Sequence, residues 1–199
     1  GNWVDVKHAD TYAGGGFTWA RDVTVDTSGN KFITGYYAGN VSFGSHQLRS
    51  TPDSNGDDTI DVFVAKLGSN GNWAWAETAG GSYDNDIGNA IASDGSGGAY
   101  VAGGFNISAN FGMNGYGSAG YTDAFVAHID SSGNWDWVTT GGGPNSDSID
   151  AVAVDSNGDL RVAGTFTGGG GTQGAQFGSQ SFNAIGAPDL FVSKITSSG

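Results

Sequence analysis

The sequence predicts an all-β protein built from three tandem copies of one antiparallel unit, and three observations support this. Landmarks recur in a fixed order: Asp26, Asp94 and Asp155 are each followed by a Gly three residues later and by another six residues after that. Short Val/Ile/Phe runs are separated by Asp-x-x-Gly sequences, which are typical of tight hairpin turns. No segment carries the i, i+3, i+4 apolar recurrence of a helix without a Gly interrupting it. We therefore expect essentially no helix.

The repeat accounts for the whole chain. The copies run approximately over residues 1–70, 71–132 and 133–199, and we expect them to form a single repeat domain over 1–199. Each copy also carries a Phe-Gly pair and an Asp-x-Phe-Val sequence that begins at Asp61, Asp123 or Asp189. Insertions at 51–60 in the first copy and 168–173 in the third fall between these landmarks, as loops on a shared scaffold would.

Each copy is expected to supply four short antiparallel strands. The first carries the Trp residues, the second is made of small apolar residues, and the third follows the Asp-x-x-Gly turn. The fourth contains the Asp-x-Phe-Val sequence. The expected strands are 3–6, 23–25, 32–34 and 62–66 in the first copy, 73–75, 90–92, 100–102 and 124–128 in the second, and 135–137, 151–154, 161–163 and 190–194 in the third. The Gly-rich stretches 13–16, 79–82 and 141–144 are predicted to be connections.

Four short antiparallel strands per copy indicate the blades of a β-propeller. A continuous sandwich and a solenoid are the alternatives, and the hairpin turns argue against the parallel coils of a solenoid. Because three blades are too few for a familiar closed ring, we expect part or all of a propeller that is completed by strand exchange or by further repeats. Two chains in one ring, a head-to-tail series and a longer array all remain open.

The second copy reads GNWAWAETAGGSYDNDIGNAIASDGSGGAYVAGGF, followed by FG and DAFVAHID. This order resembles the bacterial β-propeller repeat family known as SBBP repeats, and the resemblance covers all three copies. It implies a propeller within an extracellular or cell-surface bacterial protein and no shared catalytic reaction. The chain departs from the pattern at Asp5, which replaces a second Trp, at Trp19 in the Gly-Gly-acidic stretch, and at His128, where the other copies have Lys.

Composition narrows the function classes. The formal net charge is −13 with only seven Lys and Arg, which repels nucleic acids and anionic membrane surfaces. There is no cysteine, so disulfides and thiolate metal sites are excluded. No apolar run approaches the length needed to span a bilayer, so we expect no membrane insertion.

Calcium is the one cofactor that the sequence suggests, because carboxylates near a Gly can wrap around a hard cation. Repeated turn residues and the acidic insertion supply the candidates: Asp26, Asp94 and Asp155, and the densest cluster, Asp53, Asp57, Asp58 and Asp61. A second acidic set follows the Gly-Gly pairs and comprises Asp84, Asp86, Asp147 and Asp150. The alternative is that the turn aspartates only bond nearby backbone amides.

Trp19 is the candidate ligand-binding residue. An exposed indole offers a flat platform to a sugar ring, and Trp19 has no counterpart in the other copies. The repeated Trp residues instead suggest packing between sheets. Few residues suggest a catalytic site. His8, His46 and His128 do not have the spacing of a metal-binding triad, and the sequence contains no nucleophile-elbow motif.

The leading interpretation is a non-enzymatic, extracellular structural module of a bacterial surface. It would associate with copies of itself, or with adjoining repeats of a longer chain, through a donated β-strand. The expected self-assembly residues are Trp3, Val4 and Val6 on the donor strand and Phe191 and Val192 on the acceptor strand. The alternative is a carbohydrate-binding or adhesive propeller, with glycans as partners, and a glycoside-cleaving enzyme is a remote third.

Overall fold

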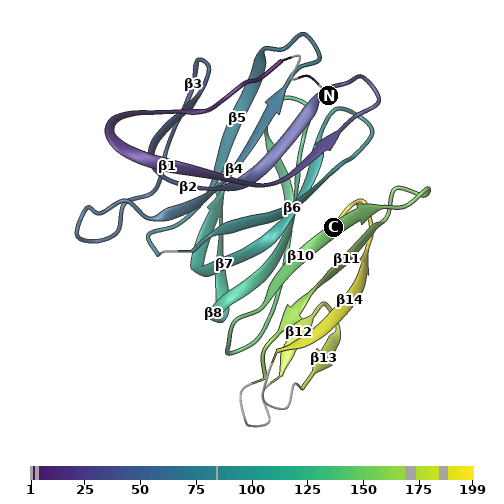
Figure 1. The fold of residues 1–199 in the computed structure, drawn as a ribbon. Coiled ribbons are helices and arrows are strands. Elements are labelled where there is room, and N and C mark those ends of the chain that lie inside the picture. Colours follow the sequence, from purple (N-terminus) through teal and green to yellow (C-terminus); the bar gives the residue numbers. More distant parts are fainter. Residues whose placement is uncertain (1, 3–4, 84, 169–173, 184–187) are drawn as a thin grey trace.

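The computed structural model describes residues 2, 5–83, 85–168, 174–183 and 188–199. The described residues contain strands and turns and no helix, so the predicted all-β class is confirmed. All pairings between the named strands are antiparallel (Figure 1). The described residues close into neither a barrel nor a propeller. They also contain no apolar helix of membrane-spanning length.

The first unit pairs four strands in the order β1–β2–β4–β5. These are β1 (Asp10–Val25), β2 (Lys31–Phe43), β4 (Ile60–Leu67) and β5 (Trp73–Gly80), and the short β3 (His46–Arg49) folds back on β2. A tight turn after Asp26 joins β1 to β2, as the Asp-x-x-Gly sequence predicts.

The second unit repeats this arrangement. It pairs β6 (Ile87–Ser93), β7 (Ala99–Phe111), β8 (Asn114–Ile129) and β9 (Trp135–Gly141) in that order. A two-residue pairing between β5 and β7 connects the first two units into one nine-stranded sheet.

The third unit has one strand fewer among its described residues. Its sheet contains β10 (Ser148–Val154), β11 (Leu160–Phe166) and β14 (Asp189–Ile195), and β12 (Ala175–Phe177) forms a separate hairpin with β13 (Gln180–Phe182). Within the described part of the chain, β14 pairs with β11 alone, whereas its counterparts β4 and β8 each have a neighbour on both sides.

The predicted connection at 13–16 is wrong, because these residues lie inside β1. The strand continues through a bulge between Thr11 and Gly16, where the register to β2 shifts. A Cβ on Gly16 would lie 2.5 Å from the Ala38 carbonyl oxygen, and its φ is +156°. The glycines therefore allow β1 to bulge while it stays paired with β2.

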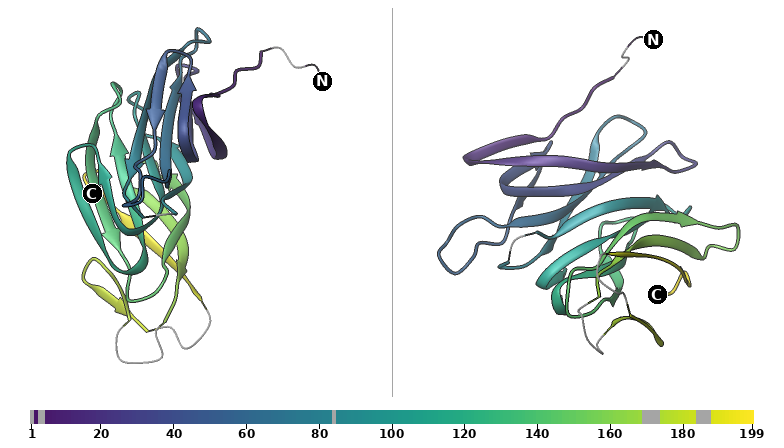
Figure 2. Two further views of the ribbon diagram at one scale, coloured as in Figure 1. Left: turned by 90° about the vertical axis from the view of Figure 1, so that its left-hand side faces the viewer. Right: turned by 60° about the horizontal axis from the view of Figure 1, so that its bottom comes forward.

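The structure describes only part of the expected first strand, 3–6. Trp3 and Val4 lie outside the described residues, while Val6 is in an unpaired segment and is 67 % exposed. Figure 2 shows the described residues 5–9 leading into β1 outside the sheets. They contact the first unit, because Ala9 packs on its apolar cluster and a Cβ on Gly71 would lie 3.6 Å from Asp5.

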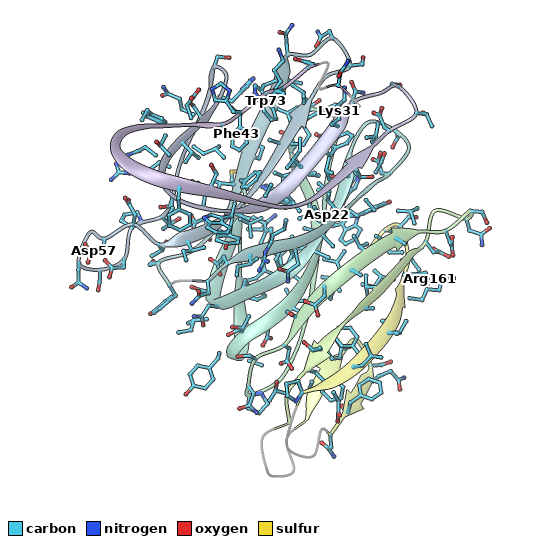
Figure 3. All side chains as sticks on the ribbon, in the orientation of Figure 1. Asp22, Lys31, Phe43, Asp57, Trp73 and Arg161 are labelled. Carbon is cyan, nitrogen blue, oxygen red and sulfur yellow. The ribbon has the colours of Figure 1, made fainter. Side chains whose placement is uncertain are left out.

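Three apolar clusters form the core. Two of them lie where consecutive units pack together, and the third is within the first unit. The Phe-Gly pairs of the first two units each start a two-residue turn that folds the Phe over a Trp: the Phe43 and Trp73 rings are 5.1 Å apart (Figure 3), and those of Phe111 and Trp135 are 5.2 Å apart. The repeated Trp residues are thus buried or partly buried, and the indole N–H groups of Trp75 and Trp135 donate to backbone carbonyls.

Candidate functional site

Unit three contains a hollow in the place where the other units hold a Trp. In the first unit a Cβ on Gly44 would lie 3.1 Å from the Trp73 ring, and in the second a Cβ on Gly112 would lie 3.5 Å from the Trp135 ring. A Cβ on the equivalent Gly178 would meet nothing within 4 Å among the described residues. The Phe-Gly turn of the third unit is therefore uncovered.

The hollow beside this turn has a volume of about 490 Å³. We call it the acceptor groove, and define it by the lining residues Phe177, Gly178, Phe191, Ser193, Lys194 and Ile195. Four of these residues belong to β14, whose second edge has no strand beside it in the described structure, and Ala124, Val126 and Thr139 of the second unit also line the hollow. A row of backbone donors and acceptors thus borders an apolar hollow.

Phe191 and Val192 lie on opposite faces of β14, as expected for neighbours on a strand. The Phe191 side chain is 7 % exposed and packs on Phe177, with ring centroids 4.1 Å apart, whereas Val192 is 71 % exposed. The two predicted acceptor residues therefore do different things: Phe191 lines the acceptor groove, and Val192 faces solvent.

We call the side of each unit that meets the next unit its forward face. Val62 and Val64 form this face in the first unit and are buried against Ile91 and Val101 of the second unit. The equivalent residues of the second unit, Ala124 and Val126, are buried against the third in the same manner. Their counterparts in the third unit are Leu190 and Val192, which are 72 % and 71 % exposed.

Charge also distinguishes the third forward face. Phe32 and Tyr100 occupy one position of this face in the first two units, and Arg161 occupies it in the third (Figure 3). Arg161 forms an ion pair with Asp155 at 2.7 Å, and the adjacent Lys194 forms one with Asp159. The face is thus apolar at two positions and cationic at two others.

The first unit carries the complementary side, its rear face. Val23 and Ile33 are the counterparts of the buried Ile91 and Val101, but Val23 is 59 % exposed and Ile33 is half-buried. Both line an open groove of about 700 Å³ that also reaches Trp73 and is bordered by the N-terminal segment at Asp5, Lys7, His8 and Ala9.

The repeated turn aspartates are engaged by backbone amides. The Oδ1 atom of Asp26 accepts hydrogen bonds from the amides of Ser28 and Asn30 at 2.8 and 2.9 Å. Asp94 and Asp155 accept the equivalent pairs of amides in their own turns. The amide of Asn157 contributes most to lowering the pKa of Asp155. This geometry matches the turn alternative, and the three aspartates lie in three separate turns.

The insertion brings Asp53, Asp57 and Asp58 into one exposed loop, and Figure 3 shows Asp57 at its projecting end. Here too the Oδ1 atom of Asp53 accepts two amides, those of Asp57 and Asn55, and these bonds lower the pKa of Asp53. No group of three or more acidic or histidine side chains among the described residues is arranged to hold a metal ion.

Trp19 is 62 % exposed on β1. Its indole stacks on the Tyr36 ring with centroids 6.3 Å apart and planes at 6°, and the Arg21 guanidinium lies 5.4 Å from the same Tyr36 ring. The structure therefore places a flat aromatic surface with an adjacent cation where the sequence predicts an exposed Trp.

The three histidines lie apart and bind different partners. His8 pairs with Asp10, and the His46 ring contacts the Trp73 carbonyl. His128 bridges Asp94 and Asp136 at 3.0 and 3.1 Å, which connects the turn after β6 to β8 and β9. This arrangement is structural.

Two buried carboxylates have a backbone role that the sequence did not reveal. Asp86 accepts the amides of Gly81 and Asn106, and Asp147 accepts those of Gly143 and Thr167. Asp86 thereby ties a Gly-Gly segment to Asn106 within β7, and Asp147 ties one to Thr167 directly after β11. The sequence did contain a sign of this role, because Asp86 and Asp147 each lie 17 residues before a repeated glycine, Gly103 and Gly164. The other acidic residues of these loops suggested cation binding instead.

No family model and no curated protein matches this chain.

Proposed function

We propose that this chain is a non-enzymatic structural module, part of an extracellular bacterial β-propeller or propeller-like array, that associates by accepting and donating a β-strand. The acceptor groove carries the proposal. It lies beside the free edge of β14 and borders the only Phe-Gly turn of the three that no described Trp covers.

The donor strand is residues 3–6 of a second copy, or the Trp strand of an adjoining repeat in a longer chain. Trp3 follows Gly1 and Asn2 as Trp73 and Trp135 follow their own Gly-Asn pairs. Pairing with β14 would satisfy the backbone groups of that edge, and the indole would cover Phe177.

The two faces that no other unit of the chain covers also support association. The third unit of one copy would pack against the first unit of the next, in the order that the units follow within one chain. The forward face of the third unit and the rear face of the first are counterparts of surfaces that pack on each other twice within the chain. A contact between them is heterologous, so it closes into a ring or continues as a filament.

The test is binding in trans of a synthetic peptide with the sequence of residues 1–9. We expect the labelled peptide to bind the intact chain, as measured by fluorescence anisotropy, and the same peptide with Trp3→Ala to bind at least about 100-fold more weakly. A peptide that does not bind, combined with a chain that sediments as a monomer at all concentrations, contradicts the proposal.

A carbohydrate-binding surface is the second candidate, because Trp19, Tyr36 and Arg21 form an exposed aromatic surface with a cation at its side. Retention of the wild type on a glycan array, and loss of that retention in Trp19→Ala, would support it. If Trp19→Ala has no effect on retention, the aromatic surface is not the binding site.

A further inference from the structure

Two buried carboxylates converge between the second and third units. Asp123 lies in β8 and Asp147 directly precedes β10, and they are 4 % and 1 % exposed. A Cβ on Gly142 would lie 2.6 Å from Oδ1 of Asp123 and 2.8 Å from Oδ2 of Asp147. The two oxygens are thus no farther apart than the sum of these distances, and Gly142 leaves the space between them free of a side chain.

The hydrogen bonds of this pair are incomplete. Both oxygens of Asp147 accept a backbone amide, and Oδ2 of Asp123 accepts the amide of Ala119 at 3.0 Å. Oδ1 of Asp123 is buried and has no hydrogen-bond partner. It is the oxygen that points toward Gly142 and Asp147.

The equivalent position of the first unit shows what is missing. There the hydroxyl of Thr59 lies 3.3 Å from Oδ1 of Asp61, and the amide and hydroxyl of Thr51 bond Oδ2. The counterpart of Thr59 in the second unit is Tyr121, which is 68 % exposed and supplies no donor to Asp123. The second unit therefore lacks the hydroxyl donor of the first unit, and Oδ1 of Asp123 is left without a hydrogen-bond partner.

No positive charge compensates the pair, because no ion pair of the described residues involves Asp123 or Asp147. Burial raises the pKa of both carboxyl groups, and the proximity of Asp147 contributes to the rise at Asp123, to about 6. Two buried carboxylates without a counter-charge are costly at neutral pH. A positively charged ligand between them would remove that cost.

We propose that Asp123 and Asp147 bind a hard divalent cation, calcium, between Oδ1 of Asp123 and Oδ2 of Asp147. Calcium binds oxygen at about 2.3–2.6 Å, so two of its ligands lie at most about 5 Å apart, and the upper limit that Gly142 sets on the separation of the two oxygens permits this spacing. Water would complete the coordination. The cation would join β8 to the loop before β10 and so stabilise the contact between the second and third units.

The experiment measures thermal unfolding of the intact chain at neutral pH, in chelator and in calcium at about 1 mM. We expect calcium to raise the Tm of the wild type by about 5 °C. Asp123→Asn should lose this rise and remain folded in chelator, because the change removes a buried charge without changing the shape of the side chain. Asp150→Asn is the control, since Asp150 is an exposed acid three residues from Asp147.

A second variant separates the site from general electrostatics. Tyr121 is exposed, and Tyr121→Thr places there the hydroxyl that Thr59 supplies in the first unit. We expect this variant to reduce the calcium-dependent rise in Tm at least about twofold, because the hydroxyl would bond Oδ1 of Asp123. Calorimetry should give one calcium per wild-type chain and none for Asp123→Asn. The proposal is overturned if calcium does not raise the Tm of the wild type, or if Asp123→Asn keeps the rise. The peptide-binding test of strand donation does not depend on either result.

Discussion

Replacing Trp3 by Ala should weaken association without affecting the fold of one chain. Trp73 and Trp135 are the counterparts of Trp3, and each packs against the Phe of a Phe-Gly turn with ring centroids 5.1 and 5.2 Å apart. Truncating a packed Trp to Ala costs about 3–5 kcal/mol. If Trp3 of one copy covers Phe177 of another, the same loss appears in the association free energy.

The expected loss corresponds to an increase in Kd of at least about 100-fold. Sedimentation equilibrium over a range of concentrations measures it directly. Trp73→Ala provides the matched comparison, since its 3–5 kcal/mol should appear as a lower free energy of unfolding in urea, whereas Trp3→Ala should leave the unfolding of the monomer unchanged. The control for nonspecific loss of an aromatic is Trp19→Ala, which lies outside the acceptor groove.

Two results would refute this reasoning. If Trp3→Ala lowers the free energy of unfolding of a monomeric chain as much as Trp73→Ala does, then Trp3 is packed within its own chain. If the Kd of self-association is the same for Trp3→Ala and the wild type, then the acceptor groove does not receive that strand.

Three further variants test the packing. Val64→Ala should lower the free energy of unfolding in urea by about 2 kcal/mol, whereas Val192→Ala, at the equivalent but exposed position, should lower it by less than about 0.5 kcal/mol; equal losses would mean that the third forward face is already covered. Gly103→Ala should cost about 3 kcal/mol in the same assay, because its Cβ would lie 1.9 Å from the Ile87 carbonyl oxygen, and an unaffected variant would contradict this close strand contact. Burial opposes ionisation of Asp94, but hydrogen bonds from the His128 ring and from backbone amides outweigh it and lower the pKa of Asp94 below its ordinary value of 3.8. Asp94 therefore contributes stability above that pH and loses it as the pH falls through its lowered pKa, so Asp94→Asn should cost about 1 kcal/mol at neutral pH and nothing in strong acid, as followed by acid titration of the unfolding midpoint.

Much of the local structure could be read from the sequence. The Asp-x-x-Gly turns form where they are expected, and Asp26 bonds the amides of Ser28 and Asn30 as its short side chain permits. In the first two units, β1, β2, β4 and β5 pair in the same order as β6, β7, β8 and β9. Trp19 was expected to be exposed because it has no counterpart in the other copies, and it is.

The errors arose where a glycine has two uses. Glycine marks a loop in most sequences, and so the stretch 13–16 was predicted to be a connection, although Gly16 allows a bulge inside β1 where Ala38 approaches closely. The small hairpins after Phe43 and Phe111 were missed for a related reason. Their Phe-Gly pairs gave no sign of the distant Trp ring that each would contact.

Alternation of apolar residues and the chemistry of turns act over a few neighbouring positions, so the strand content, the absence of helix from the described residues and the three-fold repetition follow from the order of residues alone. The acceptor groove, the exposed forward face of the third unit and the pairing of Asp123 with Asp147 depend on residues brought together from different units. Identical landmarks have different surroundings in the three units, because the second unit has a neighbouring unit on both faces, whereas the first and the third each have one on a single face.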